Sequence, residues 1–130
     1  MSSLRALVID DAPSVCTLVT MMLRKLGFEV RSANTVDSAM LVFEEEGRNF
    51  DLLVTDIAMP DALGIEAADR MRRHRADLPV VFISGVADPV LLGVVVGDRE
   101  RTVILPKPFE MAELQQAVRK LLGYLPAAVS

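Results

Sequence analysis

Residues 52–56 read LLVTD, an apolar run that ends in the carboxylate of Asp56. Three further apolar runs end in a similar way: residues 7–9 precede Asp10 and Asp11, residues 80–83 precede Ser84, and residues 103–106 precede Lys107. Short runs of this kind are typical of parallel strands that are buried on both faces. Ligands bind beyond the carboxyl ends of such strands, so we expect three carboxylates, a hydroxyl and an ammonium at one edge of a sheet. These groups suit Mg²⁺ and phosphoryl chemistry.

Segments with helical spacing of apolar residues separate the runs. Strands are predicted at residues 4–9, 28–33, 51–55, 79–83 and 102–105, and helices from Pro13 to Gly27, after Thr35, from about Ile65 to Arg73, from Asp88-Pro89, and from Glu110 to Gly123. The alternation predicts an α/β fold, a doubly wound, flavodoxin-like, five-stranded parallel sheet of order 2-1-3-4-5 with helices on both faces. Residues 28–33 are the most polar run and indicate an edge strand.

Composition limits the class of protein. With 130 residues, the chain is expected to form one domain over residues 1–123, followed by a short tail or the start of a linker at 124–130. The net charge of −4 argues against a nucleic-acid surface. Neither a signal peptide nor a bilayer-length apolar segment is evident, so the sequence predicts a cytoplasmic protein without a membrane anchor. Cys16, the single cysteine, is expected to be a small apolar residue on a helix.

Four motifs carry a resemblance to a known family. They are VIDDA at 8–12, VTDIAMPDALG at 54–64, ISG at 83–85 and LPKPF at 105–109. Each is weak alone, but together, in this order and each at the end of an apolar strand, they are specific. From Leu4 to Leu122 the chain resembles the receiver domain of two-component response regulators, of the chemotaxis-regulator type.

The resemblance implies a phosphoacceptor switch rather than a conventional enzyme, because such a domain catalyses only its own phosphorylation and dephosphorylation. Asp56 would accept a phosphoryl group from the phosphohistidine of a sensor histidine kinase or a histidine phosphotransfer protein. Mg²⁺ would be held by Asp11, Asp56 and the backbone carbonyl of Ala58, with Asp10 assisting through a water molecule. Lys107 would pair with the phosphoryl oxygens.

Two further features follow from the resemblance. Ser84, which precedes Gly85, would hydrogen-bond the phosphoryl group after transfer. The bond between Lys107 and Pro108 is expected to be cis, which is a conformation almost confined to X-Pro bonds.

Plainer explanations of the same residues stay open. Asp10 or Asp11 could cap the first helix. Lys107 could be a surface turn residue, and Ser84 before Gly85 could be ordinary turn chemistry. The arginines at the end of the third helix are expected to be solvated: Arg70, Arg72, Arg73 and Arg75.

The chain departs from the family pattern at three places. Ile104 stands where the family commonly has a switch aromatic, so it should pack inside or present an aliphatic surface. Residues 90–96 read VLLGVVV, which predicts a short, irregular or displaced fourth helix. This segment could pack internally, or it could be a docking surface for a partner or for a second copy, through the face from helix four to helix five. Ala58 and Val86 offer no group that would orient water, so we expect a long-lived phosphoryl state.

Two other functions are compatible with parts of the pattern. One is a receiver-like protein-binding module that works without phosphorylation, which Ile104 favours. The other is a phosphatase of the haloacid dehalogenase type, which also uses an aspartate nucleophile, Mg²⁺ and a lysine. The adjacent pair Asp10 and Asp11 and the lack of a cap domain argue against the phosphatase.

Overall fold

The computed structural model describes residues 4–57, 59, 64–85 and 101–126. Its sheet has five parallel strands: β1 (Arg5–Ile9), β2 (Glu29–Ala33), β3 (Leu52–Asp56), β4 (Val80–Ser84) and β5 (Thr102–Pro106). Their order is β2-β1-β3-β4-β5, which confirms the predicted topology. In this arrangement the carboxyl ends of β1, β3, β4 and β5 meet at one edge, since all the strands run the same way.

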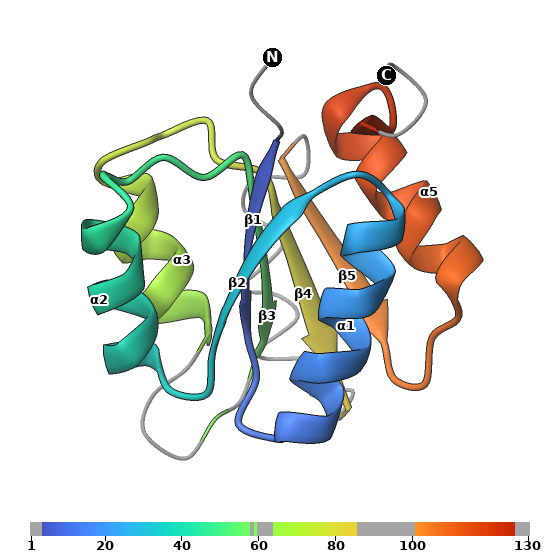
Figure 1. The fold of residues 1–130 in the computed structure, drawn as a ribbon, viewed down its shortest axis with the longest axis horizontal. Coiled ribbons are helices and arrows are strands. Elements are labelled where there is room, and N and C mark those ends of the chain that lie inside the picture. Colours follow the sequence, from blue (N-terminus) through green and yellow to red (C-terminus); the bar gives the residue numbers. More distant parts are fainter. Residues whose placement is uncertain (1–3, 58, 60–63, 86–100, 127–130) are drawn as a thin grey trace.

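Helices cover both faces of the sheet, as predicted. In Figure 1, α1 (Pro13–Lys25) and α5 (Met111–Leu122) lie on one side of the strands, and α2 (Val36–Glu45) and α3 (Gly64–Arg72) lie on the other. The predicted fourth helix and residues 90–96 lie outside the described residues.

Helix ends follow the predicted local chemistry. Thr35 is the N-cap of α2, and its side chain accepts a hydrogen bond from the amide of Ser38. Gly27 after α1 and Gly123 after α5 have φ angles of 101° and 82°, which a side chain would disfavour. Pro13 occupies the first turn of α1, where the missing amide costs little.

The sheet separates two apolar clusters. Alternate residues of the strands enter each cluster: Leu7 and Leu53 face α2 and α3, whereas Val8 and Val54 face α1 and α5. Every residue of β3 and β4 is buried, which explains why these runs show no polar alternation. The edge position of β2 is confirmed, because it pairs only with β1 and three of its five residues are exposed.

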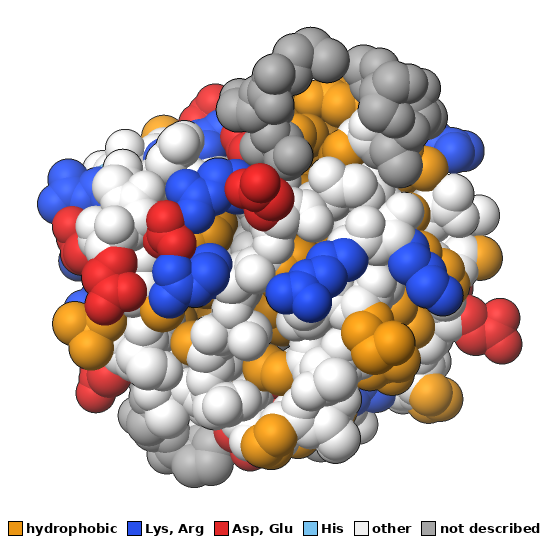
Figure 2. All heavy atoms as spheres, viewed as in Figure 1, with side chains coloured by type: hydrophobic (Ala, Val, Ile, Leu, Met, Phe, Trp, Pro, Cys, Tyr) orange, Lys and Arg blue, Asp and Glu red, His pale blue; other side chains and the backbone are white. Residues whose placement is uncertain are grey.

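Charged side chains join the amino-terminal half of the sheet to α2. The carboxylate of Glu46 forms ion pairs with Arg5 on β1 and Arg31 on β2, and it accepts a hydrogen bond from Arg31. Figure 2 shows acidic and basic side chains side by side over α2, and apolar side chains at the surface near α1. The exposed large hydrophobic residues of α1 are Leu18 and Met21.

The expectation that the arginines near the end of α3 are solvated is wrong for two of them. Arg72 donates to the carbonyl oxygens of Leu78 and Arg101 at 3.1 and 2.9 Å. Arg75 donates to the carbonyl of Phe50 and lies 3.7 Å from the carboxylate of Asp51. The two side chains therefore tie the end of α3 and the segment after it to neighbouring loops, because a guanidinium can satisfy several carbonyl groups that a loop leaves unpaired.

Two further expectations concern apolar residues. Ile104 is half-buried and packs against the cluster beneath α2 and α3, in the aliphatic role that was expected of it. Leu125 is buried in the cluster beneath α1 and α5, so part of the segment predicted as a tail packs onto the domain. Among the residues that the structure describes, no helix combines the length and the apolar character needed to cross a bilayer.

Candidate functional site

Three carboxylates meet at the carboxyl edge of the sheet. Asp10 and Asp11 follow β1, and Asp56 ends β3; each offers a ligand oxygen, and these oxygens all lie within 4.8 Å of one another. Asp10 is almost fully buried and Asp56 nearly so, whereas Asp11 is exposed. The sheet thus brings together side chains that are 46 positions apart in the chain, counted as 56 − 10.

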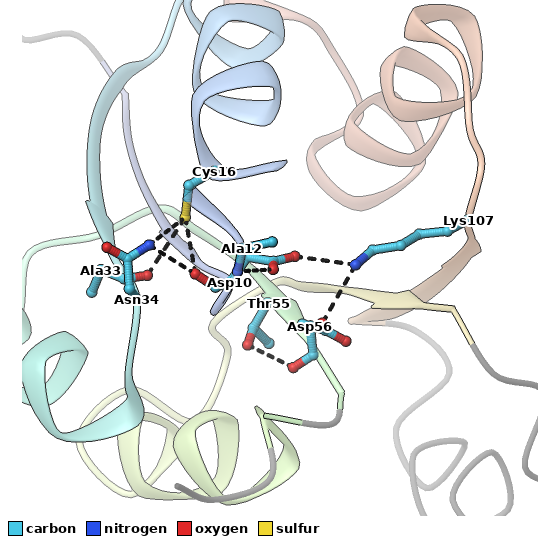
Figure 3. Close-up of polar contacts among 8 residues, drawn as sticks. All are labelled: Asp10, Ala12, Cys16, Ala33, Asn34, Thr55, Asp56 and Lys107. Atoms are coloured by element: carbon cyan, nitrogen blue, oxygen red, sulfur yellow. Dashed lines mark hydrogen bonds and ion pairs between the residues drawn. The ribbon is translucent and has the colours of Figure 1, made fainter. Parts of the chain in front are cut away.

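Lys107 balances part of this negative charge. Its Nζ lies 3.3 Å from Oδ2 of Asp10 and 3.4 Å from Oδ2 of Asp56, and Figure 3 shows the side chain reaching from the end of β5 to both carboxylates. Partial burial by itself lowers the pKa of Lys107, but the charges of Asp56 and Asp10 outweigh it and raise that pKa above 10.5. The ammonium form therefore persists at neutral pH.

The plainer explanations of Asp10 and Lys107 do not fit this geometry. The N-cap of α1 is Ala12, with no side-chain cap, and Asp10 instead accepts the amide hydrogen of Ala12 at 2.9 Å. Lys107 is only about one quarter exposed and points inward, so it is not a surface turn residue.

The turn after β5 has the predicted form. The bond between Lys107 and Pro108 is cis. The amide of Lys107 donates to the carbonyl of Ser84 at 2.8 Å, which joins the ends of β4 and β5. Ser84 is buried at the end of β4, and Gly85 beyond it is exposed with space for a side chain beside Lys107. Ala58 and Val86, for which roles were predicted, lie outside the described residues.

Thr55 and Gly64, for which the sequence predicted no role, contact the main chain of Asp56. The hydroxyl of Thr55 donates to the carbonyl oxygen of Asp56 at 2.9 Å, and Gly64 at the start of α3 packs against the same carbonyl. The amide of Gly64 also donates to the carbonyl of Ile57 at 2.7 Å. A glycine directly after a loop that follows a polar strand end is the signal that could have revealed this contact.

Asn34 and Cys16 were also missed as parts of the site. Both side chains point at the main-chain carbonyl of Asp10 (Figure 3). Cys16 was expected to be a small apolar helix residue; it is buried as expected, but its thiol also makes polar contacts. Asn34 follows β2 at the same edge of the sheet, so the rule that located the aspartates would also have located it.

The donor set fits a hard divalent cation. Carboxylate oxygens are the protein ligands that Mg²⁺ prefers, and Mg²⁺ keeps several waters. The exposed Asp11 leaves one side of the group open to solvent, where such waters could remain. The acidic triad of Asp10, Asp11 and Asp56 can therefore hold a metal ion.

Comparison with known proteins identifies the family. Residues 6–119 match the model of the response regulator receiver domain. The chain belongs to this family. Receiver domains belong to two-component signalling, and they are not conventional enzymes.

Several longer proteins contain a segment that is similar in sequence to this chain. The chain is 33% identical over 123 residues to the DNA-binding transcriptional regulator NtrC of Azospirillum brasilense, covering 95% of this chain and 25% of the relative. It is 33% identical over 121 residues to the transcriptional regulatory protein TrcR of Mycobacterium tuberculosis, covering 93% of this chain and 46% of the relative. The chain therefore spans between a quarter and a half of these two proteins.

Solved structures agree in fold. A response regulator receiver protein from Sinorhizobium medicae superposes with a TM-score of 0.83 at 29% identity, covering 94% of this chain and 96% of that one. The response regulator TrrA from Thermotoga maritima, in complex with Mg²⁺ and BeF, gives a TM-score of 0.77 at 27% identity, covering 91% and 98%. The receiver fold predicted from the sequence is thus confirmed.

Proposed function

We propose that Asp56 accepts a phosphoryl group from a phosphohistidine on a histidine kinase or a histidine phosphotransfer protein. The observation that carries the proposal is the placement of the Asp56 carboxylate. It lies at the end of a buried strand, 3.4 Å from an ammonium and beside two further carboxylates. A carboxylate is an established covalent nucleophile, and phosphoryl transfer needs mainly positioning and neutralisation of charge.

The transfer exchanges one bond for another. A carboxylate oxygen of Asp56 forms a bond to phosphorus while the bond from phosphorus to the histidine nitrogen breaks. The nitrogen keeps the electron pair and takes up a proton from solvent. Lys107, now 3.3 to 3.4 Å from two carboxylates, would offer its hydrogens to the phosphoryl oxygens.

Mg²⁺ is the cofactor that we propose for this step. Asp11 and Asp56, with the backbone carbonyl of Ala58, would hold it directly, and Asp10 would assist through water. When bound, the ion would neutralise charge on the phosphoryl oxygens. The oxygen donor set supports this assignment. The bound Mg²⁺ and BeF in the structure of TrrA support it as well.

Ser84 would hold the transferred group. The residue before it, Ile83, pairs with Asp56 in the register between β4 and β3, so Ser84 ends its strand beside the acceptor. We propose that its hydroxyl donates to a phosphoryl oxygen. We also propose that Gly85 leaves room for the group, because among the described residues its Cβ position would meet only the side chain of Lys107, at 3.7 Å. The new charge would then bias the arrangement of the neighbouring loops.

The partner would approach beside Lys107. A shallow apolar groove is lined by Val15, Leu18, Val19, Lys107, Pro108 and Phe109. Leu18 on this groove is half exposed, and contiguous apolar surfaces often mark sites of protein interaction. A kinase or phosphotransfer domain that covered this groove would bring its histidine to the side of the pocket where Lys107 lies.

We also propose that phosphorylation promotes pairing of two copies through the face that includes α5. Sedimentation with and without beryllofluoride tests this, and identical profiles would exclude it.

Intact mass after incubation with acetyl phosphate and Mg²⁺ tests the acceptor. We expect one added phosphoryl group on the wild-type protein and none on Asp56→Asn. Asp37→Asn is the matched control, because Asp37 is an exposed carboxylate in the first turn of α2, and it should be modified like the wild type. An adduct on Asp56→Asn would place the acceptor elsewhere. A wild-type protein that binds Mg²⁺ but forms no adduct, even with a protein phosphodonor, would favour the phosphorylation-independent binding module instead.

A further inference from the structure

Two side chains from outside the acidic triad converge on Asp10. Nδ2 of Asn34 donates to the main-chain carbonyl oxygen of Asp10 at 2.9 Å, and Sγ of Cys16 lies 3.3 Å from the same oxygen. Nδ2 of Asn34 and Sγ of Cys16 are themselves 3.6 Å apart. Figure 3 shows both side chains pointing at this carbonyl, one from the turn after β2 and one from α1. One backbone acceptor thus joins three elements of the fold.

The remaining polar atoms of Asp10 are also engaged. Its amide donates to the carbonyl of Ala33 at 3.2 Å. Its Oδ1 accepts from the amide of Ala12 at 2.9 Å, and its Oδ2 lies 3.3 Å from Nζ of Lys107. Contacts from β2, α1 and the end of β5 therefore fix the position of Asp10 together. Among the described residues, uncharged side chains hold its main-chain carbonyl, namely those of Asn34 and Cys16.

Asn34 does not act as the N-cap of the helix that follows it. Asparagine at this kind of position usually caps the following helix. Here the neighbouring Thr35 is the N-cap of α2, with a complete capping box to Ser38. The side-chain amide of Asn34 instead donates to the main-chain carbonyl of Asp10, at the end of β1.

Cys16 is placed to act as a hydrogen-bond donor. It is buried on α1, and its Sγ lies 3.3 Å from the carbonyl oxygen of Asp10 and 3.6 Å from that of Ala33. A thiol is a weak hydrogen-bond donor, so the buried sulfur can donate to either of these carbonyl oxygens.

We propose that Asn34 and Cys16 are positioning residues, which hold the turn at Asp10 and Asp11 in the geometry that Mg²⁺ binding requires. The proposal rests on the metal role given above. Mg²⁺ tolerates little departure from octahedral geometry, so a turn that loosens by a fraction of an ångström should bind it more weakly. Residues that orient metal ligands without touching the metal commonly alter metal affinity when they are replaced.

The test compares Mg²⁺ dissociation constants, measured by calorimetry or NMR titration, among variants that remove the two donors. Asn34→Ala and Cys16→Ala should each weaken Mg²⁺ binding by about threefold, since the other donor remains. The double variant should weaken it by more than about tenfold, beyond the product of the single effects, because the carbonyl then has no side-chain donor. Cys16→Ser, which restores a hydrogen-bond donor, should bind Mg²⁺ like the wild type.

Thr17→Ala is the matched control. Thr17 also lies on α1 and also donates to a main-chain carbonyl, that of Pro13 at 3.0 Å, but it does not contact Asp10. Its replacement should leave the Mg²⁺ dissociation constant unchanged. If the double variant also binds Mg²⁺ like the wild type, and loses only thermal stability, the positioning role is wrong.

A second readout needs no metal. Hydrogen exchange at the amide of Ala12, which donates to Asp10 Oδ1, should speed up in Asn34→Ala and in the double variant but not in Thr17→Ala. Unchanged exchange at this amide would overturn the proposal. A wild-type protein that does not bind Mg²⁺ would instead contradict the metal role itself, and the exchange data would still decide whether Asn34 and Cys16 hold the turn. If the double variant does not fold, the single variants and Cys16→Ser carry the test.

Discussion

Gly64 lies directly against the main-chain carbonyl of Asp56. A Cβ atom added to Gly64 would stand 1.9 Å from the carbonyl oxygen of Asp56 and 2.7 Å from the hydroxyl oxygen of Thr55. The carbonyl oxygen of Asp56 is a backbone atom, so it cannot yield without moving the strand. The first turn of α3 therefore backs the residue whose carboxylate we propose as the phosphoacceptor.

Gly64→Ala should consequently damage both stability and phosphorylation. Overpacking of this kind costs roughly 1–3 kcal/mol, and sometimes more. Because the clash is with Asp56 itself, the rate of phosphorylation by acetyl phosphate should fall by about tenfold or more, at a temperature where the variant is folded. Unfolding by urea and time-resolved intact mass measure the two effects.

Met71→Ala separates loss of stability from displacement of Asp56. Met71 is buried on the same helix but belongs to the apolar cluster beneath α2 and α3. Its truncation should cost roughly 2–5 kcal/mol and leave the phosphorylation rate of the folded protein near that of the wild type. Equal phosphorylation rates for Gly64→Ala and Met71→Ala would show that the contact with Asp56 has no bearing on transfer.

Lys107 should stabilise the fold with a characteristic dependence on pH. The carboxylates of Asp56 and Asp10 hold the pKa of Lys107 above 10.5 in spite of its partial burial. A raised lysine pKa gives stability that is fully present below the unfolded pKa and is lost as the pH rises through the folded pKa. The difference in unfolding free energy between the wild type and Lys107→Met should be constant from pH 7 to about pH 10 and should shrink above that. A difference that disappears by pH 8 would contradict the pairing.

Asp11→Asn should have opposite effects with and without metal. In EDTA the substitution removes one negative charge from a group of three whose oxygens lie within 4.8 Å, so stability should rise by about 1 kcal/mol. In Mg²⁺ the wild type gains stability by mass action, and the variant should gain much less. Thermal unfolding in the two buffers measures both effects. A variant that is less stable than the wild type in EDTA would argue against repulsion in the empty pocket.

Glu46 should contribute to stability above acidic pH. Hydrogen bonds from Arg5 and Arg31 hold the pKa of Glu46 below its ordinary value of 4.5. A lowered carboxyl pKa gives stability that is present above the unfolded pKa and is lost as the pH falls through the folded pKa. The urea midpoint of Glu46→Gln should thus lie below that of the wild type at pH 7, and the two should converge toward pH 3.

Glu45→Gln is the comparison for this pH series. Glu45 is more exposed than Glu46 and makes a longer contact, 3.6 Å, with Arg31 alone. Its replacement should change the urea midpoint little at any pH, because exposed pairs contribute little. Added salt should reduce the effect of Glu46→Gln. A midpoint difference that does not depend on pH would show that Glu46 acts by packing rather than by charge.

Local sequence patterns predicted much of the fold. The apolar runs that end at Asp10, Asp56, Ser84 and Lys107 predicted parallel strands. Because the carboxyl ends of parallel strands lie at the same edge of a sheet, these four side chains were expected to lie close together. Thr35 and Gly123 marked helix ends because capping depends on residues that are neighbours in the chain. The motifs around the same residues are specific enough to indicate the receiver family from the sequence alone.

Local sequence patterns did not predict the contacts between segments that are far apart in the chain. Arg72 and Arg75 looked like solvated helix residues, since nothing in their local sequence shows that unpaired loop carbonyls lie within reach. Asn34 received no role from the sequence, and Cys16 was expected to be a small apolar helix residue, although both side chains contact the carbonyl of Asp10.

The sequence by itself determined the order of the strands, the family, and the five polar side chains at the edge of the sheet. It could do so because periodicity and strand-end chemistry are local properties that survive in a single chain. Only the tertiary structure decided which backbone groups support the aspartates: Gly64 behind Asp56, and Asn34 with Cys16 behind Asp10. These contacts depend on gaps of tenths of an ångström between elements that are far apart in sequence, and packing sets such gaps.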